Sequence, residues 1–204
     1  MKTHKNLFEK IASFQNLLSA ARLAQRGKRR RQATAFFNLR LEKELWRLHE
    51  DLLHESYVPG RYRHFTIHEP KRRVISAAPY RDRVLHHAIH NVLQPIFDPA
   101  FIHDSYATRQ GKGTHAAMNR FQRFTRLNAY VLKCDIKQYF PSIDRDILMQ
   151  LISRKVACQK TLRLIQRILD SHEIGNEIAA SQPASQPASQ PRHSYRQPDF
   201  TIFC

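Results

Sequence analysis

The segment best suited to chemistry runs from Val131 to Leu148 and reads VLKCDIKQYFPSIDRDIL. Its apolar start predicts a short buried strand over 129–135 that ends at Asp135, with aromatic residues and a new helix close behind. A carboxylate at the end of a buried strand is well placed to bind a metal ion, and Mg²⁺ prefers carboxylate and phosphate oxygens. Asp135 could equally be a turn or capping residue, so the segment by itself leaves both interpretations open.

Three histidines, His86, His87 and His90, lie close together in one predicted helix. His86 and His90 are one helical turn apart, a spacing that zinc sites use because it places both side chains on one face. No Glu follows His86 as it does in metalloproteases, and no Cys is near. A helix beside nucleic acid or in the core is therefore the favoured interpretation.

The three cysteines are odd in number and far apart in the chain: Cys134, Cys158 and Cys204. This pattern argues against a disulfide framework and fits a reducing cytosol. Cys134 precedes Asp135 in the predicted strand, so we expect its side chain to point to the opposite face, into the core. No stretch approaches the roughly 20 apolar residues of a membrane span, and the N-terminus lacks a secretory signal. We expect a cytoplasmic protein with no membrane partner.

The elements around this segment follow from hydrophobic periodicity. Helices are predicted where apolar residues recur at helical spacing: residues 36–56, 81–97, about 114–126, the stretch after Asp144, and about 160–170. Residues 61–79 alternate apolar and polar side chains around Glu69-Pro70, which predicts a two-stranded hairpin. Asp144 is a good N-cap for the helix that follows it. The pattern indicates an α+β fold with helices packed on a small antiparallel sheet.

The end of the chain has a different composition. Residues 181–191 read SQPASQPASQP, a near-perfect four-residue repeat without branched or aromatic side chains. Such a repeat cannot contribute to a core, so 176–204 is predicted to be a disordered low-complexity tail.

The charge of the chain points to a polyanionic partner. The 204 residues contain 34 Lys and Arg against 17 Asp and Glu, a formal net charge of +17. Nine basic residues lie in 1–31, seven in 61–83 and six in 101–133, interleaved with Tyr and Phe. Basic side chains neutralise phosphates and aromatic faces stack on bases, so this mixture is typical of nucleic-acid binding. The alternative is a set of solvated helix faces.

Three segments in order resemble the reverse transcriptases, in particular the group II intron-like bacterial enzymes. They are KRRVISAAPYRDRVLHHAI (Lys71 to Ile89), FIHDSYATRQGKGTHAA (Phe101 to Ala117) and the segment from Val131 to Leu148. Within that family the strings FTIHEP and VISAAP are most similar to enzymes of diversity-generating retroelements. The resemblance covers about 36–175 and implies the fingers and part of the palm of a right-hand polymerase.

The resemblance also implies a role for individual residues. Asp135 matches the aspartate that binds both catalytic Mg²⁺ ions, and the carbonyl of Ile136 lies where one ion finds a backbone ligand. Phe140 matches the aromatic residue that discourages ribonucleotides. The basic residues divide into fingers cations that bind the incoming triphosphate, Arg73 and Lys71, and a template-contacting pair, Arg109 and Lys112. Arg suits bidentate phosphate binding, so Arg73 is the stronger candidate of the first pair.

The chain departs from the family after about Gly175. Family members continue with a block that contains Gly and Gln and then a strand turn, Tyr-x-Asp-Asp, that supplies further metal-binding carboxylates; no Asp-Asp pair occurs in this chain. We therefore expect an N-terminal fragment with an incomplete metal site. Its predicted parts are a basic arm or helix over 1–35, fingers and partial palm over 36–175, and the tail over 176–204.

Two functions from different classes follow. The first is an RNA-directed DNA polymerase of a bacterial retroelement that is truncated and inactive alone. Its partners would be an RNA template, a DNA primer, deoxynucleoside triphosphates and Mg²⁺, with an accessory protein or second chain completing the palm. The alternative is a non-catalytic RNA-binding module derived from such an enzyme. A third, weaker interpretation is an unfolded pseudogene product, because the missing palm strands would leave apolar surface uncovered.

Overall fold

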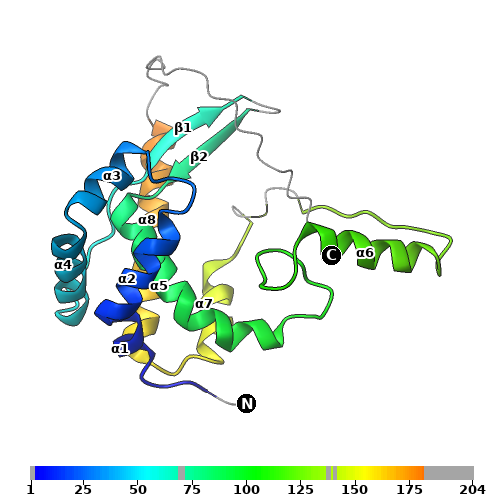
Figure 1. Cartoon of the computed structure of the whole chain (residues 1–204), viewed down its shortest axis with the longest axis horizontal. Coiled ribbons are helices and arrows are strands. Elements are labelled where there is room, and N and C mark those ends of the chain that lie inside the picture. The colour runs from blue at the N-terminus through cyan, green and yellow to red at the C-terminus, as the bar shows by residue number, and fades with distance from the viewer. Residues whose placement is uncertain (1–2, 69–71, 137–138, 140–141, 182–204) are drawn as a thin grey trace. The chain divides into compact units, whose positions relative to one another are not determined.

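The computed structural model describes residues 3–68, 72–136, 139 and 142–181 (Figure 1). The described residues divide into two compact units, one that lies within 3–95 and 144–181 and one that lies within 96–143. We describe each unit by itself. Within the described ranges, no helix is long and apolar enough to cross a membrane.

The first unit contains most of the secondary structure. Its elements in chain order are α1 (Leu7–Ala12), α2 (Phe14–Ala24), α3 (Gln32–Leu39), α4 (Leu41–Leu53), β1 (Arg63–Ile67), β2 (Arg73–Ala77), α5 (Tyr80–Phe97, whose last residues enter the second unit), α7 (Arg145–Ser153) and α8 (Gln159–Ser181). The second unit contains the short 3-10 helix η1 (Asp98–Ala100) and α6 (Thr114–Thr125). The structure is thus mixed, with helices and one small antiparallel sheet, as predicted.

Most predicted elements are confirmed, and two boundaries are corrected. The expected single helix over 36–56 is two helices, because Arg40 has non-helical backbone angles (φ −120°, ψ 30°) and ends α3 where α4 begins. The expected helix over 160–170 is the longer α8, which continues through Ser181 into the predicted tail. Residues 182–204 lie outside the described ranges.

The core of the first unit is built largely from the N-terminal helices. Ile11 of α1 and Leu17 of α2 are completely buried, together with Leu45 and Leu48 of α4 and Leu85 of α5. Apolar residues at helical spacing give each helix one buried stripe, and the stripes meet in a single cluster. The first 31 residues therefore supply core packing in addition to positive charge.

The hairpin of β1 and β2 is antiparallel, with Phe65 opposite Ile75 and Ile67 opposite Arg73. The Nδ1 atom of His64 lies 2.9 Å from the hydroxyl of Ser76 across the ladder. A two-stranded hairpin is marginally stable by itself, so its base needs support from the helices.

A buried aspartate anchors the base of the hairpin. The carboxylate of Asp82, 3% exposed at the start of α5, accepts hydrogen bonds from the Tyr57 hydroxyl (2.9 Å) and the Gly60 backbone N–H (2.8 Å). A side chain at position 60 would not fit, because its Cβ would lie 2.7 Å from Cγ of Pro79. Burial, and then the charge of Asp82, raise the pKa of Tyr57, so its hydroxyl stays a donor. These contacts join the segment before β1 to α5.

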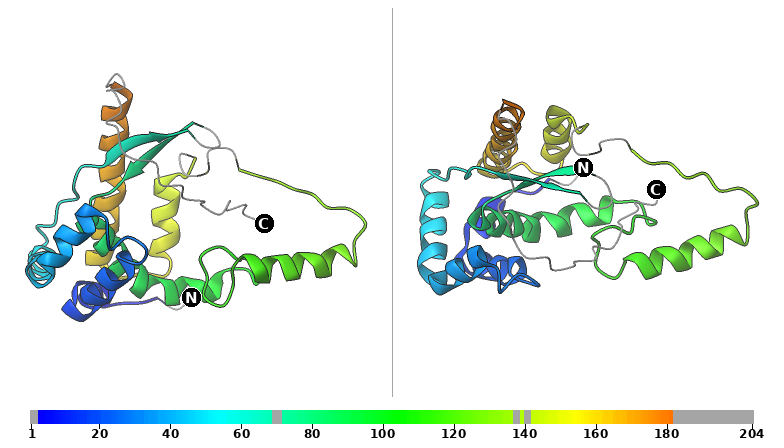
Figure 2. Two further views of the ribbon diagram at one scale, coloured as in Figure 1. Left: turned by 45° about the horizontal axis from the view of Figure 1, so that its top comes forward. Right: turned by 90° about the horizontal axis from the view of Figure 1, so that it is seen from above.

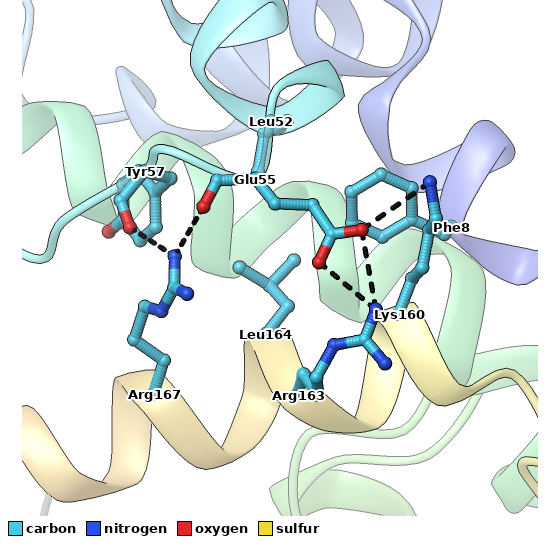
Figure 3. A pocket seen from close by; sticks show the side chains of 8 residues that line it. All are labelled: Phe8, Leu52, Glu55, Tyr57, Lys160, Arg163, Leu164 and Arg167. Atoms are coloured by element: carbon cyan, nitrogen blue, oxygen red, sulfur yellow. Dashed lines mark hydrogen bonds and ion pairs between the residues drawn. The ribbon is translucent and has the colours of Figure 1, made fainter.

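Helix α8 also contacts the segment before β1, at Glu55 and Tyr57 (Figure 3). Arg163 Nη2 lies 3.0 Å from Oε2 of Glu55, and Lys160 Nζ lies 3.4 Å from Oε1. Arg167 donates to the carbonyl oxygens of Glu55 (2.9 Å) and Tyr57 (2.8 Å). The hydrogen bond from Arg163 lowers the pKa of Glu55. In both views of Figure 2, α7 and α8 lie side by side.

Candidate functional site

Asp135 lies in an exposed segment without regular secondary structure. Tyr130 is 93% exposed and Leu132 is 88% exposed, and no strand is formed over 129–136. The prediction of a buried strand is therefore wrong, and so is the expectation that Cys134 points into the core, because its thiol is free and exposed. A strand needs a neighbouring strand for its backbone hydrogen bonds. The only strands among the described residues, β1 and β2, pair with each other in the first unit.

The described residues do not assemble a metal site around Asp135. They contain no group of three His, Cys, Asp or Glu side chains that could hold a metal ion. Asp144 caps α7 by accepting a hydrogen bond from the backbone N–H of Ile147 (3.0 Å), as predicted. One exposed carboxylate is too small a donor set for magnesium, which needs several oxygen ligands. We therefore derive no metal-dependent step from these residues.

The predicted nucleotide-binding residues fall at the hairpin and beyond Asp135. Arg73 is the first residue of β2 and pairs with Ile67 across the ladder. Lys71 and Phe140 lie outside the described residues. The roles of all three in nucleotide binding stay predictions.

Arg109 stabilises the loop between α5 and α6. Its guanidinium forms an ion pair with Asp98 (Nε to Oδ1, 2.8 Å) and donates to the carbonyl oxygens of Ile102 (2.9 Å), Ser105 (3.3 Å) and Asp98 (3.2 Å). The hydrogen bond from Arg109 lowers the pKa of Asp98. The side chain of Arg109 is only 13% exposed. Arg109 therefore organises residues 98–109.

Lys112, the second predicted template residue, also has contacts inside the loop. Its Nζ donates to the carbonyl oxygen of His103 (2.7 Å) and lies 4.9 Å from the centre of the Tyr106 ring. Both predicted template cations thus help to fold residues 98–113. Their contact with a template stays a prediction.

Sequence reasoning missed the acidic partners that fold this loop. Asp104 accepts two hydrogen bonds from Arg120 of α6 (2.9 and 3.2 Å) and one from the Tyr106 hydroxyl (2.9 Å). The hydrogen bond from Arg120 holds the pKa of Asp104 well below its usual range. The sequence contains a signal for this pairing, because Asp104 is the only acidic residue in 101–133, where six residues are basic. An isolated acid in such a block is expected to pair with one of them.

We predict that Arg109→Lys loosens the loop although it keeps the charge. Lysine lacks the planar fork that reaches Asp98 and several carbonyl oxygens together. Amide hydrogen exchange over 98–113 is expected to accelerate about tenfold, while exchange in α4 stays unchanged. Mass spectrometry of deuterium uptake would measure this. Arg123→Lys, at an exposed position of α6, is the matched control, and equal uptake in the two variants would contradict the role of Arg109.

Comparison with known proteins decides the family. The sequence profile of the family described as reverse transcriptase (RNA-dependent DNA polymerase) matches residues 67–194, more than half of the chain. The chain belongs to the reverse transcriptase family. This match includes the hairpin strand β2, the loop with Arg109 and Lys112, and Asp135.

Relatives of this reverse transcriptase family member include a group II intron-encoded protein and an intron maturase. It is 25% identical over 138 residues to the group II intron-encoded protein LtrA of Lactococcus lactis subsp. cremoris, covering 66% of this chain and 23% of the relative. It is 27% identical over 116 residues to an uncharacterized 91 kDa protein in the cob intron of Schizosaccharomyces pombe, covering 57% and 14%. It is 26% identical over 100 residues to nuclear intron maturase 1, mitochondrial, of Arabidopsis thaliana, covering 48% and 14%. The predicted resemblance to group II intron-like reverse transcriptases is confirmed, and the chain spans less than a quarter of the length of each of these three relatives.

Proposed function

We propose that this chain takes part in RNA-directed DNA synthesis by a bacterial retroelement in the cytoplasm. In this proposal it is the fingers and first palm part of a reverse transcriptase, and it binds an RNA template, a DNA primer and deoxynucleoside triphosphates. The observation that carries the proposal is the family match over 67–194. The net charge of +17 supports it, because a basic surface favours a phosphate backbone.

Within this function, Asp135 and the carbonyl of Ile136 are proposed as ligands of Mg²⁺. The further carboxylates would come from residues other than these 204. Phosphoryl transfer needs its developing charge neutralised and its reactants positioned, which one carboxylate cannot do alone. The chain alone is therefore proposed to bind nucleic acid without polymerising nucleotides.

The hairpin is proposed to contact the incoming nucleotide. Arg73 at the start of β2, with Lys71 beside it in sequence, would bind the triphosphate, and Phe140 would lie against the sugar. Arg109 and Lys112 would act by holding the loop over 98–113 in the shape that contacts the template. Their internal hydrogen bonds favour this indirect role over direct contact.

A non-catalytic RNA-binding module is the second candidate. One observation favours it: the segment that carries Asp135 is exposed and unpaired, and the described residues hold no three-ligand metal cluster. The two candidates differ in whether further carboxylates complete a metal site with Asp135. Such a site is needed by the polymerase and not by the RNA-binding module.

Primer extension on poly(rA) with an oligo(dT) primer and Mg²⁺ tests the proposal, run beside RNA binding at several salt concentrations. We expect the chain alone to bind the hybrid in a salt-sensitive way and to incorporate no nucleotide, with Asp135→Ala binding as well as wild type. Incorporation that Asp135→Ala abolishes would show that these residues suffice for polymerisation and would overturn the proposed dependence on other carboxylates. If the wild-type chain showed no salt-sensitive binding of the hybrid, both candidate functions would be overturned.

A further inference from the structure

Helices α2 and α3 each contact α5, at two different points along it. Near the start of α2, Asn16 donates to the carbonyl oxygen of Ala88 (3.0 Å) and accepts from the side chain of Asn91 (3.0 Å). The ring of Phe37 in α3 lies 5.1 Å from the ring of Tyr80 at the start of α5. The connection over 25–31, which leads from α2 to α3, therefore lies near the first half of α5.

This connection is strongly basic and unneutralised. It contains a run of four exposed cations, Lys28, Arg29, Arg30 and Arg31. Within the described part of the chain, none of the four forms an ion pair with a carboxylate. The four neighbouring positive charges repel one another, and water, salt or a bound polyanion reduces this repulsion.

One face of α5 adds further basic side chains beside the connection. Arg83, His87 and His90 are spaced i, i+4 and i+7, so they lie on one helix face and extend about 10 Å along its axis. Arg83 is partly buried with its guanidinium 5.2 Å from the centre of the Tyr80 ring. The arrangement is linear, which suits a chain of phosphates better than a single ion.

The electrostatic neighbours of His87 are all basic. Burial lowers the pKa of His87 most, followed by the charges of His90, Lys28 and Arg83. Burial also lowers the pKa of His86, the preceding residue, against the charge of Asp82, which raises it, and the charge of His87 lowers it further. Lys28 belongs to the connection and Arg83 to α5, so both elements that face His87 present positive charge. His87 is consequently neutral near pH 7 in the free protein.

We propose that Lys28, Arg83, His87 and His90 form a binding site for the phosphodiester backbone of RNA, and that His87 takes up a proton from solvent when the phosphate binds. This site lies apart from the hairpin and the loop over 98–113 in sequence. It rests on the proposed function only for the identity of the polyanion as RNA.

The proton uptake gives the site a distinctive pH dependence. A phosphate beside His87 favours the charged imidazolium, so the pKa of His87 rises on binding. Because the complex then holds more protons than the free protein, binding tightens as the pH falls. Tighter binding at lower pH is expected for any histidine that lies beside a phosphate. The share that belongs to His87 is therefore measured with a variant at position 87.

Fluorescence anisotropy of a labelled single-stranded RNA of about 20 nucleotides, with the full chain, tests the site. From about pH 8 to about pH 6, wild type should bind progressively more tightly, whereas His87→Gln should show a clearly smaller pH dependence, with the remainder coming from His90. Lys28→Gln and Arg83→Gln should each weaken binding about three- to fivefold at about 0.15 M salt and lower the salt slope by about 0.7. Thermal unfolding followed by circular dichroism identifies variants that are not folded.

Matched controls make the result decisive. Lys43→Gln removes an exposed cation of α4, and His54→Gln removes a histidine whose Nδ1 lies 3.6 Å from Glu50. Both should bind RNA as wild type does. Equal losses in Lys43→Gln, an unchanged pH dependence in His87→Gln, or displacement of RNA by inorganic triphosphate at equal phosphate concentration would overturn the site. RNA binding that persists in wild type under those outcomes would leave the proposed function intact.

Discussion

Replacing Asp82 by alanine is expected to lower the free energy of unfolding of the first unit by about 3 kcal/mol. The carboxylate is 3% exposed and accepts from the Tyr57 hydroxyl and the Gly60 backbone N–H. Its removal leaves two buried donors unpaired and a cavity at the base of the hairpin. Urea denaturation followed by circular dichroism would measure the change.

Two further variants separate this network from a general effect of charge. Asp146→Ala removes an exposed carboxylate in the first turn of α7 and should change stability by less than about 1 kcal/mol. Tyr57→Phe removes one of the two donors and should cost about 1 kcal/mol. If Asp82→Ala were no more destabilising than Asp146→Ala, the hairpin would not depend on this network.

Deleting residues 1–31 should abolish cooperative unfolding of the first unit. Ile11 and Leu17 are completely buried in the same cluster as Leu45 and Leu85. Each large apolar side chain contributes about 1.5–3 kcal/mol when buried, and a domain is stable by only about 5–15 kcal/mol in total. Differential scanning calorimetry of the shortened chain should therefore show no sharp transition.

A charge-only variant provides the control for this deletion. Lys5→Gln, Lys10→Gln and Arg22→Gln together remove exposed cations from the N-terminal region and leave its apolar residues in place. This triple variant should keep a single sharp transition. A shortened chain that unfolds as sharply as the triple variant would show that the N-terminal helices are a dispensable arm.

Much of the local structure was predictable from the sequence because local spacing carries it. The alternation around Glu69-Pro70 predicted the hairpin, the apolar spacing predicted α5 and α6, and Asp144 caps α7 as expected. The helix break at Arg40 was not predictable, because the apolar spacing continues through it and only the backbone angles interrupt the helix. Asp135 could be located as a candidate metal ligand by its motif, and the family match includes it.

The sequence by itself determined the family, the basic character and most of the helices and the hairpin, since these depend on residue type and spacing alone. Only the tertiary structure decided how the charges are used. Arg109 and Asp82 look like ordinary surface charges in the sequence, yet Arg109 is hydrogen-bonded within its own loop and Asp82 accepts from Tyr57 and Gly60, more than 20 residues earlier in the chain. The same holds for the segment over 129–136: its apolar pattern is that of a buried strand, but burial requires a neighbouring strand, and the described residues provide none beside it.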